Sequence, residues 1–163
     1  MLLRPVMRTV VAVSLVALCG TAAFAQLPNP YGMSIGAEFA KKAATAALAE
    51  ARKNNWTMAA AIVDTAGDLV YFEKLDGTQA ASILIAQDKA RSSVRFKRPT
   101  KALQDVLAAG GEGLRMLGLQ GAVPVEGGIP LIMDGKIVGA IGVSGGTSGQ
   151  DGQCAKAGAD TIK

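Results

Sequence analysis

Histidine is absent from the 163-residue chain, which removes the commonest general base and the commonest metal ligand at once. Cysteine is scarce too, since Cys19 and Cys154 are the only two thiols. Aromatic residues make up 4% of the chain, and Trp56 is its single tryptophan. No stretch matches an EF-hand calcium loop or a phosphate-binding P-loop. Histidine-based catalysis and histidine-based metal sites are therefore excluded, and nucleotide binding is disfavoured.

Residues 1–25 have the pattern of a secretory signal peptide. Arg4 and Arg8 form a basic start, and the apolar run that follows is shorter than the ~20 residues of a membrane-spanning helix. Ala23-Phe24-Ala25 is the small-x-small pattern that a signal peptidase cleaves, with Gln26 as the first mature residue. We therefore predict a periplasmic or secreted protein that has no membrane attachment after cleavage.

Removal of this segment changes what the composition means. Taking 25 from 163 residues leaves 138, enough for one domain with its own core. The 17 lysines and arginines fall by two to 15, against 13 acids, so the mature net charge is +2 and does not favour nucleic acid as a partner. Cys19 is lost, and the bulky Leu18 before it disfavours a lipoprotein. Cys154 is then expected to be a small buried helix residue, with an intermolecular bridge or a thiolate ligand as the alternatives.

Apolar periodicity, turn residues and helix caps predict a single α+β domain over residues 34–163, after a connector over residues 26–33. Ser34 is the expected cap of the first helix. Two tight turns, one of them at Asp134-Gly135, demand antiparallel pairing, so we expect a mostly antiparallel sheet covered by helices. The expected elements are helices over 34–54, 80–96, 100–108 and from 148 or 151 to 162, and strands over 56–63, 69–74, 123–126 and the two runs of 129–143.

The glycine-rich turn after the last strand is the first candidate site. Gly145, Gly146 and Thr147 could direct backbone N–H groups at a carboxylate or phosphate, and the start of the following helix adds partial positive charge. The alternative is a plain strand-to-helix connection in which Ser148 or Asp151 caps the helix.

A basic stretch from residue 89 to residue 101 is the second candidate. Arg98, held at a defined angle by Pro99, and Lys89 are the residues expected to contact anionic groups of a small ligand. The alternative is a solvated helix face. Phe96 is the only aromatic residue in the stretch, so a nucleic-acid surface is not expected. The six cations are Lys89, Arg91, Arg95, Lys97, Arg98 and Lys101.

Glu126 is the third candidate, because it stands directly before the Gly127-Gly128 bend, where a ligand could approach without obstruction. If the protein is an enzyme acting on a carboxylated metabolite, Glu126 is the expected general base and Arg98 the carboxylate clamp. The other acids lie singly in turns, where they fit ordinary turn chemistry. No metal site is predicted.

Several short motifs together resemble the GlcG/HbpS family over about residues 34–163. None of them is specific alone, but taken together they are. They are Val63-Asp64 with Gly67, Leu69-Val70 and Phe72; Asp76-Gly77; Ile85-Ala86 with Lys89-Ala90; Phe96 with Arg98-Pro99-Thr100; Gly127-Gly128-Ile129-Pro130; Asp134-Gly135; Gly139 to Gly145; and Gln150-Asp151 with Ala157-Gly158.

This resemblance implies a profilin-like α+β domain that forms dimers and larger rings up to octamers. It implies heme, or another acidic planar ligand, as the cofactor, with Thr100 as a near contact. The family's histidine ligand has no counterpart here, so the conceivable axial groups are Tyr31, Tyr71, Met116 and Met133. Members of the family also stand beside glycolate or alcohol oxidation systems. An interaction protein associated with such a system is therefore a further alternative, besides the small enzyme.

Overall fold

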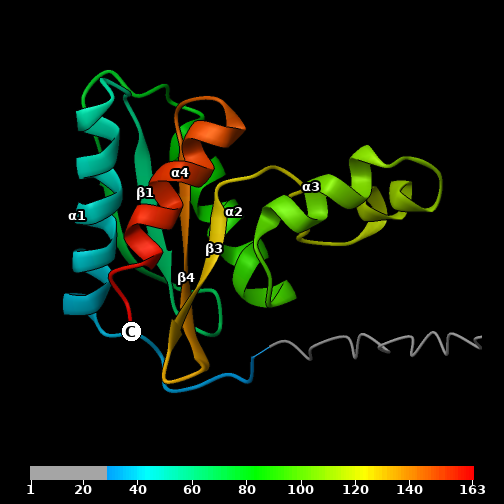
Figure 1. Cartoon of the computed structure of the whole chain (residues 1–163), viewed down its shortest axis with the longest axis horizontal. Coiled ribbons are helices and arrows are strands. Elements are labelled where there is room, and N and C mark those ends of the chain that lie inside the picture. Colours follow the sequence, from blue (N-terminus) through cyan, green and yellow to red (C-terminus); the bar gives the residue numbers. More distant parts are fainter. Residues whose placement is uncertain (1–28) are drawn as a thin grey trace, which may run out of the picture.

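The computed structural model describes residues 29–163 (Figure 1), so the predicted signal peptide and the first residues of the connector lie outside the described residues. No helix in the described part is both long and apolar enough to span a membrane. The elements in chain order are α1 Ala37–Lys53, β1 Ala59–Val63, β2 Leu69–Lys74, α2 Ser82–Phe96, α3 Thr100–Ala108, the 3₁₀ helix η1 Gly111–Gly118, β3 Gly128–Met133, β4 Lys136–Ser144 and α4 Ser148–Ala159.

The four strands form one sheet in the order β2-β1-β4-β3, and each neighbouring pair is antiparallel. The expected α+β class with a mostly antiparallel sheet is confirmed. Asp134 and Gly135 both have positive φ, 49° and 71°, as a tight two-residue hairpin turn requires. At the other end of the hairpin, Pro130 in the edge strand β3 limits further pairing, because proline has no N–H to donate.

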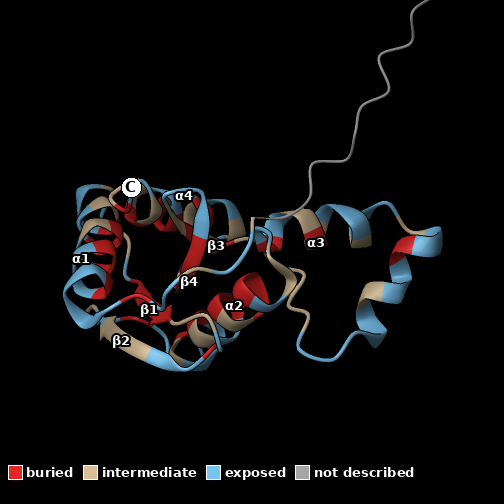
Figure 2. Cartoon of the chain, turned by 90° about the horizontal axis from the view of Figure 1, so that it is seen from below, coloured by how far each residue is buried: buried red, intermediate tan, exposed pale blue. Residues whose placement is uncertain are grey.

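The sheet lies between two helical layers, with α1 and α4 on one face and α2 on the other (Figures 1 and 2). All five residues of β1 are buried, as expected for a central strand that is covered on both faces. The side chains of β1 and β4 that pack in the α1 and α4 layer are Ala60, Ile62, Ile141 and Val143, whereas Ala59, Ala61, Val63 and Ala140 belong to the clusters on α2.

The close approach of α2 to the sheet depends on glycine. A Cβ placed on Gly142 of β4 would overlap the carbonyl oxygen of Ala86 and lie 2.6 Å from the backbone nitrogen of Ala90. Backbone therefore packs against backbone at this point. Ala86 and Ala90 are fully buried, so small residues on both surfaces bring α2 onto β4.

The first helix starts later than predicted, and the last helix ends earlier. The first helix begins at Ala37 after Gly36, and the Oγ of Ser34 instead shares a 2.7 Å hydrogen bond with the Oγ1 of Thr65. Ile35 is buried and its N–H donates to Val138 O at 2.7 Å, so this segment extends along β4 before it can turn into a helix. The last helix ends at Ala159 rather than at residue 162.

The predicted strand over residues 123–126 is wrong. These residues form a loop, because none of their N–H groups donates to a neighbouring strand. Val123 N donates to Ser92 Oγ at 2.9 Å, Glu126 N to Gln104 Oε1 at 2.8 Å, and Val125 N to the nearby Val123 O at 2.9 Å. Pro124 between them has no N–H for a ladder.

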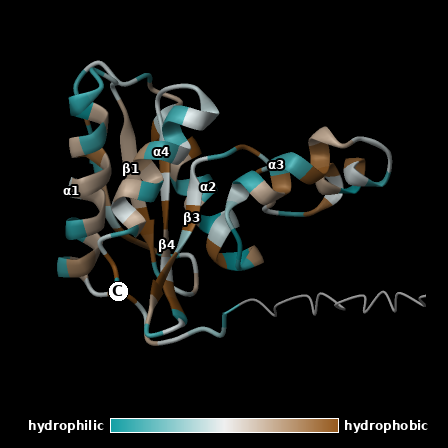
Figure 3. Ribbon diagram, in the orientation of Figure 1, coloured by the Kyte–Doolittle hydropathy of each residue, from teal (hydrophilic) through white to brown (hydrophobic). Residues whose placement is uncertain are grey.

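Residues 100–125 form an arm that projects from the three layers (Figure 1). It consists of α3, η1 and the return segment to Val125, and hydrophobic residues are spread along it (Figure 3). Leu114 and Leu117 are 55% and 71% exposed. The arm therefore presents apolar surface to its surroundings.

Candidate functional site

Lys89 does not point into solvent. Its side chain is 1% exposed, and its Nζ lies 2.6 Å from Asp151 Oδ2 and donates to the carbonyl oxygen of Val143 at 3.2 Å. The ion pair joins α2 to α4 across the ends of β3 and β4. Burial raises the pKa of the Asp151 carboxyl, and the contact with Lys89 opposes that rise. The charge of Lys89 is therefore engaged inside the chain.

The glycine-rich turn also uses its donors internally. Gly146 N donates to Asp151 Oδ1 at 3.0 Å, and Thr147 N donates to Gln150 Oε1 at 2.9 Å. Thr147 Oγ1 accepts from Gln150 N, which completes a capping box, so Thr147 caps α4 rather than Ser148 or Asp151. Gly145 is required by space, since a Cβ there would lie 2.7 Å from Met58 Cα.

Thr100 is fully buried at the start of α3, and its Oγ1 accepts a 2.9 Å hydrogen bond from Gly128 N. A Cβ on Gly128 would lie 2.7 Å from Thr100 Cγ2, and one on Gly127 would lie 2.9 Å from both Lys89 Nζ and the Asp151 Cβ. The Gly127-Gly128 bend therefore brings together Lys89, Thr100 and the glycine-rich turn, which are far apart in the sequence.

Glu126 lies at the edge of the same bend and is half-buried. Its side chain packs on Gly152 of α4, where a Cβ would lie 2.7 Å from the Glu126 Cγ. Its charge acts on Lys101, whose pKa is raised first by its hydrogen bond to Asp105 and, as a smaller contribution, by Glu126. Among the described residues, no ion pair joins Glu126 to Arg98.

Three cations at the end of α2 and in the turn before α3 form no ion pair within the described residues. Arg95, Lys97 and Arg98, which we call the basic turn, have no carboxylate within 4.0 Å among the residues that the structure describes. Arg98 is exposed, and its Nε donates to Phe96 O at 3.1 Å. Lys97 has φ 53° and ends α2, and its Nζ lies 4.1 Å from the centre of the Tyr31 ring.

The arm starts and ends beside the basic turn. Thr100, the first residue of α3, follows Arg98 after one proline. On the return segment, Gly121 lies against Arg95, whose Nη1 is 3.5 Å from the position of a Cβ on Gly121. The cations without an acidic partner therefore lie at the base of the arm, next to its return segment, whereas Leu114 and Leu117 lie in η1 at its outer end (Figure 1).

Oxygen groups proposed as axial ligands are already engaged. The Tyr31 hydroxyl donates to Val94 O at 2.8 Å, and the Tyr71 hydroxyl donates to Glu73 Oε2 at 3.1 Å. Desolvation, followed by the contacts with Glu73, raises the pKa of Tyr71, so its phenolate is disfavoured. Thr100 is buried as described, and Met133 lines a cavity at the β3–β4 turn. Met116 is half-buried in the arm.

Two further observations limit the chemistry. In the described part of the chain, no three residues among histidine, cysteine, aspartate and glutamate are grouped to hold a metal ion. Cys154 is fully buried in α4, and burial, with smaller contributions from Glu50 and Asp151, raises the pKa of its thiol to about 11. The thiol is therefore protonated at neutral pH.

The sequence identified the candidate site residues but not the side chains that bond to them. The buried role of Asp151 has no signal in a single sequence beyond its place at a helix start, where it reads as a cap. The role of Gln104 as an acceptor for Glu126 N depends on how the arm returns, which no local pattern specifies. Arg95 and Lys89 lie in the same basic stretch of the sequence. Only the fold shows that Lys89 is buried against Asp151 while Arg95 is exposed.

Comparison with known proteins gives a consistent relationship. Residues 35–160 match the family model described as "Haem degrading protein HbpS-like". The chain is 35% identical over 95 residues to Protein GlcG of Escherichia coli, an alignment that covers 58% of this chain and 69% of the relative. It is also 34% identical over 114 residues to an uncharacterized 15.0 kDa protein from the dhaT-dhaS intergenic region of Citrobacter freundii, which covers 69% of this chain and 80% of that protein.

Solved structures agree with this relationship. The crystal structure of HbpS superposes with a TM-score of 0.74 at 31% identity, over 81% of this chain and 92% of HbpS. The crystal structure of a PduOC:heme complex gives a TM-score of 0.72 at 26% identity, over 80% of this chain and 96% of PduOC. One similar structure therefore holds heme.

Proposed function

Because the HbpS-like family model spans most of its described length, the chain belongs to that family, and we propose that it binds heme or another planar ligand with acidic groups. The family description and the heme in the PduOC structure support heme as the ligand. The similar structures do not show which residues of this chain would contact the ligand. Those residues are therefore inferred from the geometry of this chain.

The observation that carries the proposal is the basic turn beside the arm. Arg95, Lys97 and Arg98 offer charges without an acidic partner in the described part of the chain, and guanidinium groups bind carboxylates in a bidentate way. Leu119 is 41% exposed and stands two residues before Gly121, the residue that lies against Arg95, so it offers apolar surface beside these charges. A heme has a wide apolar ring and two carboxylates on one edge, which fits such a combination.

The hydroxyl groups considered as ligands of the heme iron are already engaged. The chain contains no histidine, the Tyr31 and Tyr71 hydroxyls are hydrogen-bonded, and Thr100 is buried. Lys89 and the glycine-rich turn, predicted as further anion contacts, are engaged with Asp151 and Gln150. The proposed binding therefore relies on Arg98 and its neighbours and on apolar contact, and we expect a modest affinity.

Titration of the mature protein with hemin tests this proposal. We expect a saturable change in the Soret band, with Arg98→Ala weakening the apparent affinity by about five- to tenfold, because one charge-assisted contact to a carboxylate is lost. Lys41→Ala is the control, since Lys41 is an exposed cation of α1 on the opposite face of the sheet. No saturable change, or equal losses in both variants, would contradict the proposed site.

We propose further that the protein is exported, as the pattern of residues 1–25 predicts. Expression of the full chain in a Gram-negative host should give a periplasmic product 25 residues shorter, beginning at Gln26. Intact-mass measurement and N-terminal sequencing of the periplasmic fraction check this. A full-length product confined to the cytoplasm would show that the segment is not a cleaved signal.

Two other predictions stay open as proposals. A homo-oligomer, from dimer up to octamer, is supported by the exposed leucines of the arm, which a second copy could cover. The small-enzyme alternative rests on Glu126, whose side chain packs on Gly152, and Glu126→Gln should abolish turnover only if that alternative is correct.

A further inference from the structure

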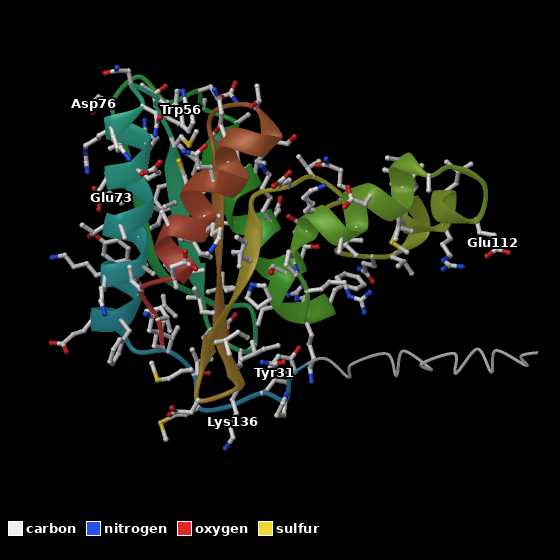
Figure 4. The ribbon with its side chains drawn as sticks, in the orientation of Figure 1. Tyr31, Trp56, Glu73, Asp76, Glu112 and Lys136 are labelled. Atoms are coloured by element: carbon white, nitrogen blue, oxygen red, sulfur yellow. The ribbon has the colours of Figure 1, made fainter. Side chains whose placement is uncertain are left out.

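A second cavity lies away from the basic turn, at the end of α1 and the start of β1. Its volume is about 520 Å³, within the roughly 300–1,000 Å³ range of small-molecule sites. Arg52 in the last turn of α1, Asn55 and Trp56 in the following loop, and Lys74 and Asp76 at the end of β2 line it. Figure 4 shows Trp56 and Asp76 close together at one end of the molecule.

Trp56 is held in place by the fold. Its backbone N–H donates to Ala51 O at 2.9 Å. The half-buried indole packs against the main core cluster and also lines the cavity. Asn55 before it has φ 58°, the left-handed conformation that ends α1 and turns the chain toward β1. The single tryptophan of the chain is therefore a fixed platform at a polar cavity.

The charges around the cavity balance. Arg52 Nη2 lies 3.3 Å from Glu73 Oε1, so that cation is already partnered. Lys74 and Asp76 are both exposed at the cavity, and within the described chain Lys74 has no carboxylate at ion-pair distance. Glu73 is not part of the lining but offsets the charge of Arg52, which leaves Lys74 and Asp76 as one cation and one carboxylate, so the cavity does not favour a ligand with a net charge of either sign.

We propose that this cavity is a binding site for a neutral saccharide. A sugar ring has an apolar face of C–H groups, which the Trp56 indole can cover, and hydroxyl groups that both donate and accept hydrogen bonds. Asp76 supplies an acceptor, Lys74 a donor, and the amide of Asn55 supplies both. Donors and acceptors side by side, with little net charge, are the chemistry that hydroxyl groups require.

Tryptophan fluorescence tests the site directly, because Trp56 is the only tryptophan of the chain. The mature protein is titrated with glucose, galactose, N-acetylglucosamine and cellobiose, each up to about 100 mM. We expect a saturable change with at least one of them, at a Kd on the order of 1–10 mM, as an open site of this size gives. Asp76→Asn and Lys74→Met should each weaken that binding by about threefold or more.

Lys136→Met is the matched control, since Lys136 lies at the β3–β4 turn at the far end of the sheet from Trp56 (Figure 4). It should leave the titration unchanged. No saturable change with any of the four sugars would overturn the proposal, as would saturation that neither Asp76→Asn nor Lys74→Met weakens. Benzoate is titrated in parallel, and saturation by benzoate alone would show an anion site instead.

Discussion

Replacing Lys89 by methionine is expected to lower the free energy of unfolding by about 3–5 kcal/mol, the usual cost of removing one partner of a buried ion pair. The side chains of Lys89 and Asp151 are 1% and 4% exposed, so water cannot solvate the carboxylate that stays behind. Methionine keeps most of the packed methylene chain of lysine. The loss of stability therefore reflects the missing charge rather than a new cavity. Urea unfolding of the mature protein measures it.

An exposed pair supplies the control. Lys101 Nζ lies 2.8 Å from Asp105 Oδ1, but the two side chains are 50% and 60% exposed, so Lys101→Met should cost less than about 1 kcal/mol. The double variant Lys89→Met with Asp151→Asn should lose clearly less than the sum of its two single variants, because it leaves neither charge buried alone. Equal losses at Lys89 and Lys101 would contradict the buried-pair account.

The loss at Lys89 should also depend on pH. Burial raises the pKa of Asp151, and a carboxyl whose pKa is raised on folding contributes stability below its ordinary range and loses it as pH rises through the raised pKa. Without Lys89 to oppose it, that rise becomes larger. The deficit of Lys89→Met should therefore shrink from about pH 7.5 toward about pH 5, because the stranded carboxylate takes up a proton.

Gly142→Ala is the second substitution with a large expected effect, a loss of about 3 kcal/mol in the free energy of unfolding. The added Cβ would overlap the carbonyl oxygen of Ala86 and approach the backbone nitrogen of Ala90, and neither can move without displacing α2 from the sheet. Urea or thermal unfolding of the purified variant measures the loss.

Gly149→Ala makes the same chemical change where there is room. A Cβ on Gly149 in the first turn of α4 would meet nothing within 4 Å, so alanine should leave stability unchanged or raise it by up to about 1 kcal/mol. A Gly142→Ala variant as stable as Gly149→Ala would mean that α2 and β4 are not in backbone contact.

Local patterns were sufficient for most of the fold. Asp134-Gly135 specified a hairpin, and Pro99 lies between the two helices predicted over residues 80–96 and 100–108. The errors lie where a side chain outcompetes a local rule. Ser34 bonds Thr65 instead of capping α1, and Gln104 and Ser92 take N–H groups of residues 123–126 that a strand would have needed.

The candidate site was predicted less completely, for a physical reason. A sequence shows which residues carry charge, but not whether a fold supplies a partner for that charge. Lys89 and Arg98 read alike in one basic stretch, yet Asp151 lies 62 positions from Lys89 and neutralises it, whereas Arg98 stands exposed. Only the arrangement of α2, α3 and α4 distinguishes the two cations.

The most direct test of the proposed function compares two ligands that differ only in the iron, hemin and metal-free protoporphyrin IX. Both carry the same carboxylates, and equilibrium titrations with the mature protein and with Arg98→Ala give four affinities. Binding through the basic turn predicts affinities within about threefold for the two ligands, both weakened by Arg98→Ala. A protoporphyrin affinity about a hundredfold below that of hemin would show that a side chain of this protein coordinates the iron, and it would contradict the account.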